Sequence, residues 1–261
     1  MSGKPPTAES VRTWIGHLER EAERFATMVT RSPLPAHVPA YPDFTVHSLS
    51  AHIGRGLRLF HGILTGGETD AAIAVPTGAE IADWVRAGLR PLVSALQDVS
   101  PDKLVPFPHQ AGDRPAGLIA PLLAVEVGVH RWDVESVLGE HAPIPPELAV
   151  REVENVFTNF VPRLAARGVA DIGGIVWLRT TDTAHAWSAR VAGDRLVTEP
   201  SPDQPGDTAV TVAGPAQDIA LLVWKRALPP RAELEVTGSA DVVKRFLVTD
   251  YIPDPRTTPA H

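Results

Sequence analysis

Hydrophobic positions in the first half of the chain recur at helical spacing. Over residues 7–30, apolar side chains return every three or four positions, as on one face of an α-helix. The same spacing predicts helices over 45–65 and 81–96, and a fourth that begins near Gly117 or Pro121 and ends before Gly139. Links that contain proline or glycine separate these segments. The pattern predicts a bundle of four helices.

The periodicity changes in the second half. A fifth helix is expected over 146–168, interrupted by Pro162, and alternation with a period of two then predicts strands. These strands fall at 173–181, 185–193, 195–200, 209–214 and 233–238, with a hairpin turn at 193–194 and helices at 215–228 and 239–247. The sequence therefore predicts an α+β chain with a helical bundle at 1–145 and a small unit of helices and strands at 146–261.

Composition narrows the classes of function. The net charge of −7 argues against a nucleic-acid partner, whose binding surface is normally basic. The chain has no cysteine, which excludes disulfides, thiolate metal ligands and a cysteine nucleophile. Any sulfur chemistry must use a thiol supplied from outside. The first residues lack the apolar core of a signal peptide, and no apolar run is long enough to span a bilayer, so we expect a cytoplasmic protein without a membrane partner.

The predicted fourth helix carries polar residues in an unusual place. It is apolar on nearly every side, which is typical of a buried helix, yet Glu126, His130 and Asp133 follow one line along it. A buried carboxylate costs several kcal/mol of desolvation unless another group compensates its charge. A divalent metal ion is one such group, and an ion pair with Arg131 or Arg86 is another. The residues alone leave both open.

The spacing of Glu126 and His130 suits a metal site. Side chains four residues apart on a helix can reach one ion, and a tetrahedral zinc site then needs one more protein ligand and an open position. His52, at the edge of the apolar stripe of the second helix, is the best candidate, and we expect it to point into the bundle. The competing interpretation is an internally bonded acid beside a core histidine.

Residues near these three have subsidiary predicted roles. Asp133 would orient a ligand histidine or pair with an arginine. Gly54 and Gly56, which are poor helix formers, would leave room for a ligand beside His52 or permit close helix packing.

The quoted segments resemble a known family. "PDFTVHSLSAHIG" followed by "EVGVHRWDVE" resembles the N-terminal domain of the mycothiol-dependent maleylpyruvate isomerase family, one of the DinB-like metal-binding four-helix bundles. "WSARVAGDRL", "DTAVTVAGPAQDIALLVWKRALP" and "LEVTGSADVVKRFL" are similar to its sterol-carrier-like C-terminal domain. The resemblance runs through nearly the whole chain in order. Phe44 stands where members of the family often have tryptophan.

The resemblance implies a site and a chemistry. His52, Glu126 and His130 take the three metal-ligand positions, for zinc, and the open position would bind the thiolate of mycothiol, a low-molecular-weight thiol of actinobacteria. Zinc lowers the pKa of a thiol and holds the thiolate for attack. In the isomerase reaction the thiolate adds to the double bond of a cis-enoate, the bond rotates and the thiol leaves. Arg245 is the nearest match to the family's arginine that would bind the substrate carboxylate, and a solvated position on a helix face is the alternative interpretation.

The sequence leaves several functions open. The leading hypothesis is an enzyme that uses zinc and mycothiol for isomerisation or S-transfer on a small electrophilic substrate, and the sequence does not separate those two reactions. A protein that binds an apolar ligand and keeps a relic metal site is one alternative, and a metal-dependent hydrolase that needs no thiol is another. The expected partners are the small-molecule substrate and the thiol, and the expected state is a monomer or a homodimer.

Overall fold

A computed structural model describes residues 7–67, 73–108, 112–226 and 232–252. Contacts within the chain divide it into two compact units, one extending to Ala142 and the other beginning at Pro143. The sequence prediction placed this boundary after residue 145, and the last residues of its second domain, 253–261, lie outside the described part. The two units are described separately below.

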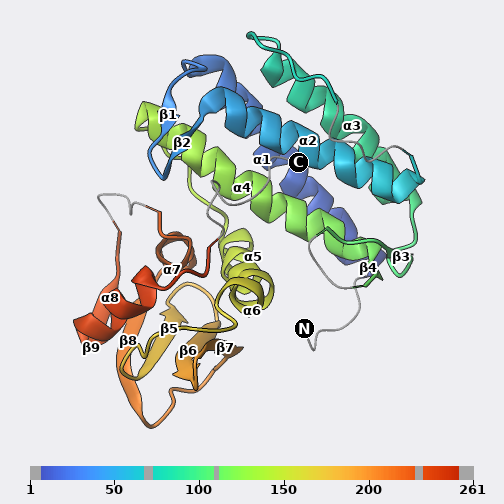
Figure 1. Ribbon diagram of the computed structural model, residues 1–261. Helices are drawn as coiled ribbons and strands as arrows, with labels where there is room; N and C mark the ends of the chain where they lie inside the picture. The colour runs from blue at the N-terminus through green and yellow to red at the C-terminus, as the bar shows by residue number, and fades with distance from the viewer. Residues whose placement is uncertain (1–6, 68–72, 109–111, 227–231, 253–261) are drawn as a thin grey trace. The chain divides into compact units, whose positions relative to one another are not determined.

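The N-terminal unit is a bundle of helices (Figure 1). Short strand pairs and a 3₁₀ turn, η1, occupy the connections between them. The elements are α1 (Ala8–Arg31), β1 (His37–Val38), β2 (Tyr41–Thr45), α2 (Val46–Thr65), α3 (Ile81–Asp98), β3 (Leu104–Val105), β4 (Arg114–Pro115), η1 (Ala116–Leu118) and α4 (Ile119–Leu138). The four predicted helices are thus confirmed, and Pro91 lies inside α3 without ending it.

Helix ends follow the local sequence signals, with one exception. Thr45 begins α2 with a capping box, in which its side chain accepts from the Ser48 N–H and Ser48 bonds back to the Thr45 backbone. Gly66 and Gly139 adopt the left-handed conformation that ends α2 and α4, with φ of 69° and 68°. Ser239 is the exception: a serine in this place before α8 (Ala240–Val248) is a typical N-cap, but its side chain makes no capping hydrogen bond within the described residues.

The core of the bundle is built around α4. Because α4 is apolar on most sides, it is buried along most of its length and packs most extensively against α1. Leu18 and Phe25 of α1 and Val134 of α4 are fully buried. Burial of a side chain of this size stabilises a fold by about 1.5–3 kcal/mol. The helix that carries the polar line is therefore held firmly in place.

A buried cluster of charges joins α4 to its neighbours. Arg131 is completely buried; its Nε donates to Glu21 of α1 and its Nη1 donates to Glu135 one turn along α4. The same Nη1 donates to the carbonyl oxygen of Ala142 at 3.0 Å, and the Ala142 N–H donates to Glu135 at 3.1 Å. Burial raises the pKa of Glu135, although the nearby Arg131 opposes that shift. The cluster fixes α1, α4 and the end of this unit to one another.

The C-terminal unit combines helices with a sheet (Figure 1). Within the described residues its strands pair in the order β7-β6-β5-β8-β9; β5 and β8 are parallel and the other neighbours are antiparallel. The elements are α5 (Pro146–Asn155), η2 (Val156–Phe160), α6 (Val161–Leu164), β5 (Ile175–Thr180), β6 (Ala186–Ala192), β7 (Arg195–Pro200), β8 (Thr208–Gly214), α7 (Ala216–Val223), β9 (Glu235–Gly238) and α8 (Ala240–Val248). The predicted α+β fold class is confirmed.

Pro162 is preceded by an irregular turn in the first helical segment of this unit. Residues Val156–Phe160, labelled η2, form a π-helical turn, and the Val161 N–H donates to the carbonyl of Val156, five residues earlier. A proline inside an α-helix lacks the N–H for the ladder and its ring collides with the preceding turn, and a π turn relieves both problems. The helix predicted to reach residue 168 ends instead at Leu164.

Candidate metal centre

Three predicted side chains converge in the N-terminal unit. His52 comes from α2, and Glu126 and His130 come from consecutive turns of α4. Glu126 Oε1 lies 3.0 Å from His52 Nε2 and 3.3 Å from His130 Nε2. One potential ligand atom of each residue lies within 4.8 Å of the other two. The structure therefore gathers two imidazole nitrogens and one carboxylate oxygen at a single point.

Asp133 orients one of these side chains. His130 Nδ1 donates to Asp133 Oδ2 at 2.9 Å, and Asp133 is completely buried. A carboxylate bonded to one ring nitrogen fixes the tautomer and turns the other nitrogen outward. The other nitrogen, Nε2, is the one that faces Glu126. This hydrogen bond corresponds to one of the two roles predicted for Asp133, the orientation of a histidine.

The expectation that His52 points into the bundle is met only in part, because the side chain reaches Glu126 on α4 but stays partly exposed. Its side chain is 47% exposed, against 28% for Glu126 and 13% for His130. The ring of His52 meets His130 edge to face, with 5.4 Å between centroids, and it meets Phe44 in the same way at 6.4 Å. His52 is exposed because it sits at the edge of the apolar stripe of α2. One side of the triad is consequently open to solvent.

Gly54 and Gly56 of α2 have different surroundings. One permits close helix packing and the other lies beside open space. A Cβ atom on Gly54 would lie 1.9 Å from the ring of Trp84 on α3, so Gly54 permits close helix packing. A Cβ atom on Gly56 would meet nothing within 4 Å in the described structure. Gly56, one turn beyond His52, therefore borders free space.

The alternative ion pairs for Glu126 are not formed by the two arginines considered. Arg131 belongs to the buried cluster described above, and Arg86 bonds Glu23 on α1 at 2.9 Å. Both guanidinium groups thus neutralise other carboxylates. The partners of Glu126 are the two histidines.

Burial and hydrogen bonding shift the pKa values of Glu126 and His130 in opposite directions. Burial alone would raise the pKa of Glu126, but the hydrogen bonds from His130 and His52 outweigh it and hold the pKa well below its ordinary value of 4.5. Burial alone would lower the pKa of His130, but its hydrogen bonds to Asp133 and Glu126 raise the pKa to about 9. Both shifts favour an ionised Glu126 and a protonated His130 at neutral pH in the metal-free protein.

This pKa can be tested in the metal-free protein. Because the pKa of His130 is higher in the folded protein, protonation of His130 stabilises the fold. This stabilisation is complete below pH 6.5 and is lost as the pH rises through about 9. We expect an NMR titration to give His130 a pKa of about 9, and Asp133→Asn to lower it because the neutral amide attracts the imidazolium less. A wild-type His130 that titrates near 6.5 would contradict this account.

Arg245 lies in the C-terminal unit, on α8. Its Nε donates to the carbonyl oxygen of Ile172 at 2.8 Å. A Cβ atom on Gly173 would lie 2.4 Å from Arg245 Nη2, so the guanidinium packs directly against this glycine. Gly173 has a φ of 85° and precedes β5. Sequence patterns do not reveal this contact, because residues 173 and 245 are distant along the chain.

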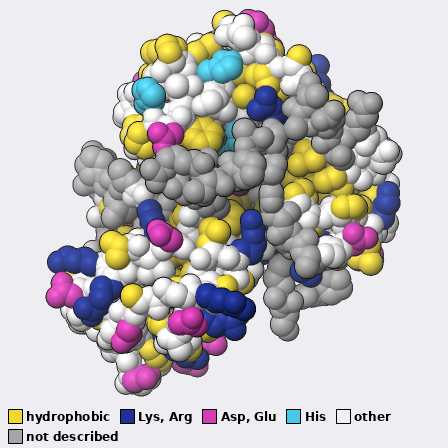
Figure 2. Space-filling model, in the orientation of Figure 1, with side chains coloured by type: hydrophobic (Ala, Val, Ile, Leu, Met, Phe, Trp, Pro, Cys, Tyr) yellow, Lys and Arg dark blue, Asp and Glu magenta, His cyan; other side chains and the backbone are white. Residues whose placement is uncertain are grey.

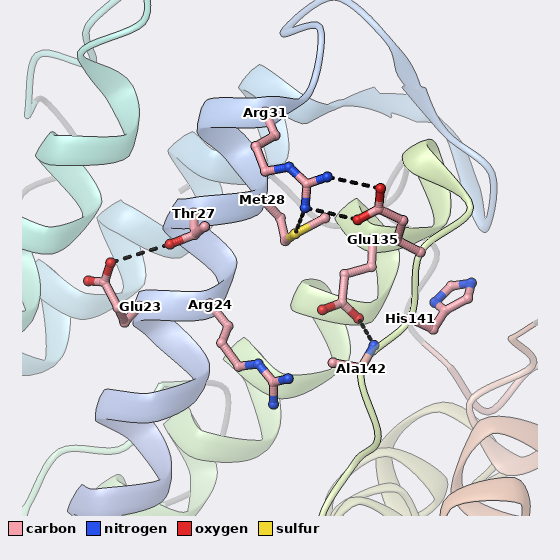
Figure 3. A pocket seen from close by; sticks show the side chains of 9 residues that line it. Glu23, Arg24, Thr27, Met28, Arg31, Glu135, His141 and Ala142 are labelled. Carbon is pink, nitrogen blue, oxygen red and sulfur yellow. Dashed lines mark hydrogen bonds and ion pairs between the residues drawn. The ribbon is translucent and has the colours of Figure 1, made fainter.

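A separate pocket of about 360 Å³ lies between α1 and the C-terminal end of α4 (Figure 3). Arg31 bonds Glu140 there at 2.9 Å, and Glu135 on its wall accepts the Ala142 N–H. The triad residues are not part of its lining. Since these acidic groups are already bonded within the protein, the triad remains the candidate site.

The visible surface of the sheet unit carries charges of both signs. On the face shown in Figure 2, acidic and basic side chains are interspersed over the described part of this unit. Across the part of the chain that the structure describes, no helix combines the length and the apolarity needed to cross a membrane.

Comparison with known proteins supports the resemblance. Residues 15–135 match the family model of the mycothiol maleylpyruvate isomerase N-terminal domain. The chain also resembles a solved structure described as the mycothiol-dependent maleylpyruvate isomerase, with a TM-score of 0.58 and 14% sequence identity over 87% of this chain and 92% of that one.

A second solved structure extends the comparison. It is a mutant of the mycothiol-dependent maleylpyruvate isomerase in which a histidine is replaced by alanine. Its TM-score is 0.56 at 14% identity, over 83% of this chain and 90% of that one. At such low identity these structures establish the shared fold. No curated protein sequence matches the chain at a significant level.

Proposed function

We propose that this protein is a metal-dependent enzyme that uses mycothiol to isomerise a small cis-enoate related to maleylpyruvate. The observation that carries the proposal is the triad, in which three ligand atoms lie within 4.8 Å of one another and one side is open. Two imidazole nitrogens and a carboxylate form a donor set typical of catalytic zinc, which keeps a fourth position free. The family of the N-terminal unit and the shared fold point to the same chemistry.

Each residue has a distinct part in this proposal. His52, Glu126 and His130 would hold the ion, and Asp133 keeps His130 turned toward it. When bound, zinc would lower the pKa of the thiol and hold the thiolate within reach of an electrophile. The exposed side of His52 admits the thiol and the substrate. Arg245 would bind a substrate carboxylate with its remaining donors, since its Nε is already bonded to Ile172.

The experiment is a turnover assay on zinc-loaded protein. Maleylpyruvate is supplied with mycothiol, without thiol, or with mycothiol after the metal has been removed. We expect the trans isomer only when both thiol and metal are present. A product that retains sulfur would indicate S-transfer instead, and turnover without thiol would indicate a hydrolase. A protein that neither binds metal nor turns over substrate would be a binding protein.

The role of Arg245 gives a matched pair of variants. We expect Arg245→Ala to lower kcat/KM by about 10- to 100-fold, with the metal content unchanged. This factor corresponds to the free energy of one hydrogen bond to a charged group. Gly173→Ala should also lower it, because the new methyl group displaces the guanidinium. Gly168→Ala is the control: its φ of 69° is strained in the same way, but the methyl group would meet nothing within 4 Å in the described structure. Full activity in Arg245→Ala would remove this residue from the mechanism.

A further inference from the structure

The open side of the triad continues along one face of α2. His52, Arg55, Gly56 and Leu59 stand at positions i, i+3, i+4 and i+7, which share a face of a helix. Side chains three and four residues apart on such a face have Cβ atoms about 5–6 Å apart. Because nearly half of the His52 side chain is exposed, Arg55 and Gly56 border the side from which a ligand reaches the triad.

Arg55 lacks the internal partners that an enclosed arginine normally has. Its Nε is shielded from solvent and has no hydrogen-bond partner, and the side chain forms no ion pair within the described residues. Arg58, one turn further, differs: it donates to the carbonyls of Gly54 and Trp84 at 2.9 and 2.7 Å. Shielded polar atoms in native proteins are nearly always bonded, so an unbonded Nε points to a partner supplied from outside.

Space and charge next to Arg55 define that partner. A Cβ atom at Gly56 would meet nothing within 4 Å in the described part of the chain, so open space lies next to Arg55 on the helix face that carries His52. A guanidinium presents parallel donors that match the two oxygens of a carboxylate. The only acid of the triad, Glu126, already bonds both histidines and leaves Arg55 unpaired.

We propose that Arg55 binds a carboxylate of the substrate, which makes anionic electrophiles, rather than neutral ones, the substrate class of this site. The inference rests on the proposed function for the reaction, but the binding itself is independent of turnover. A dicarboxylate would then meet one cationic group on the same helix as His52.

The test is the binding of maleate, a small dicarboxylate, to zinc-loaded protein by calorimetry. Arg55→Gln removes the charge, and Arg90→Gln removes the same charge from an exposed position on α3 as the control. We expect Arg55→Gln to weaken maleate binding by about 10- to 100-fold and Arg90→Gln to leave it unchanged. Arg55→Lys should restore part of the affinity. Metal content and melting temperature confirm that each variant is folded.

Two results would overturn the proposal. One is equal affinity in the Arg55→Gln and Arg90→Gln proteins, and the other is a wild-type protein that does not bind maleate. In the turnover assay Arg55→Gln should raise KM for a carboxylate substrate and leave KM for its methyl ester unchanged. If maleate binds through Arg55 but thiol supports no turnover, the proposed reaction fails and the assignment of Arg55 stands.

Discussion

Alanine at His52, Glu126 or His130 is expected to remove the bound metal. The wild-type protein should carry about one zinc per chain, because the donor set is complete for a three-ligand site. Loss of a residue that merely supports a ligand weakens metal binding by about 10- to 100-fold, and loss of a ligand itself should cost more. Elemental analysis of purified protein measures this directly, beside circular dichroism to verify the fold.

The structure supplies controls for this experiment. His52→Ala should disturb folding least, since its side chain is the most exposed of the three. His61→Ala removes another imidazole from the same helix, away from the triad, and should leave the metal content unchanged. A triple variant that retains its metal would show that the ion is bound elsewhere. A wild-type protein that takes up no metal even when zinc is supplied would make Glu126 and His130 structural.

Replacement of Arg131 by alanine is expected to cause the largest loss of stability. The guanidinium is completely buried between the carboxylates of Glu21 and Glu135, and its removal leaves two buried acids without their cation. Breaking a buried ion pair in this way typically costs about 3–5 kcal/mol. Urea unfolding of the metal-free protein should show a much lower midpoint with little change in slope.

Two further variants distinguish the burial of charge from the loss of a contact. Arg86→Ala breaks a pair with Glu23, whose side chain is 61% exposed, and should cost no more than about 1 kcal/mol. A triple variant with apolar residues at Glu21, Arg131 and Glu135 should recover most of the lost stability, because no buried charge remains unpaired. If Arg131→Ala is no less stable than Arg86→Ala, the cluster is not a significant source of stability.

The sequence predicted the elements well because they follow from periodicity. The stripe of α2, the all-round apolar surface of α4, and the stops at Gly66 and Gly139 need no tertiary information. Glu126 and His130 could be paired for the same reason, since four residues along a helix define a shared face. The choice of His52 needed only the edge of a neighbouring stripe and the family resemblance.

Other features depended on how helices pack, which periodicity does not encode. A residue at the edge of an apolar stripe can be enclosed or exposed, and only the packed structure shows that the His52 side chain is 47% exposed. Arg131 finds its partner Glu21 at a separation of 110 residues, which a local pattern cannot reveal. The unbonded state of Arg55 and the contact between Gly173 and Arg245 are likewise visible only in three dimensions.

The division of the triad between two helices affects how an ion would leave. Glu126 and His130 belong to α4, which is anchored in the core, whereas His52 belongs to α2, which contacts α4 much less than it contacts α3. An ion held by all three would join two helices that otherwise touch little. A small outward movement of α2 would then remove one ligand and leave two. The residence time of the metal would therefore report the local opening of α2, well before the bundle unfolds.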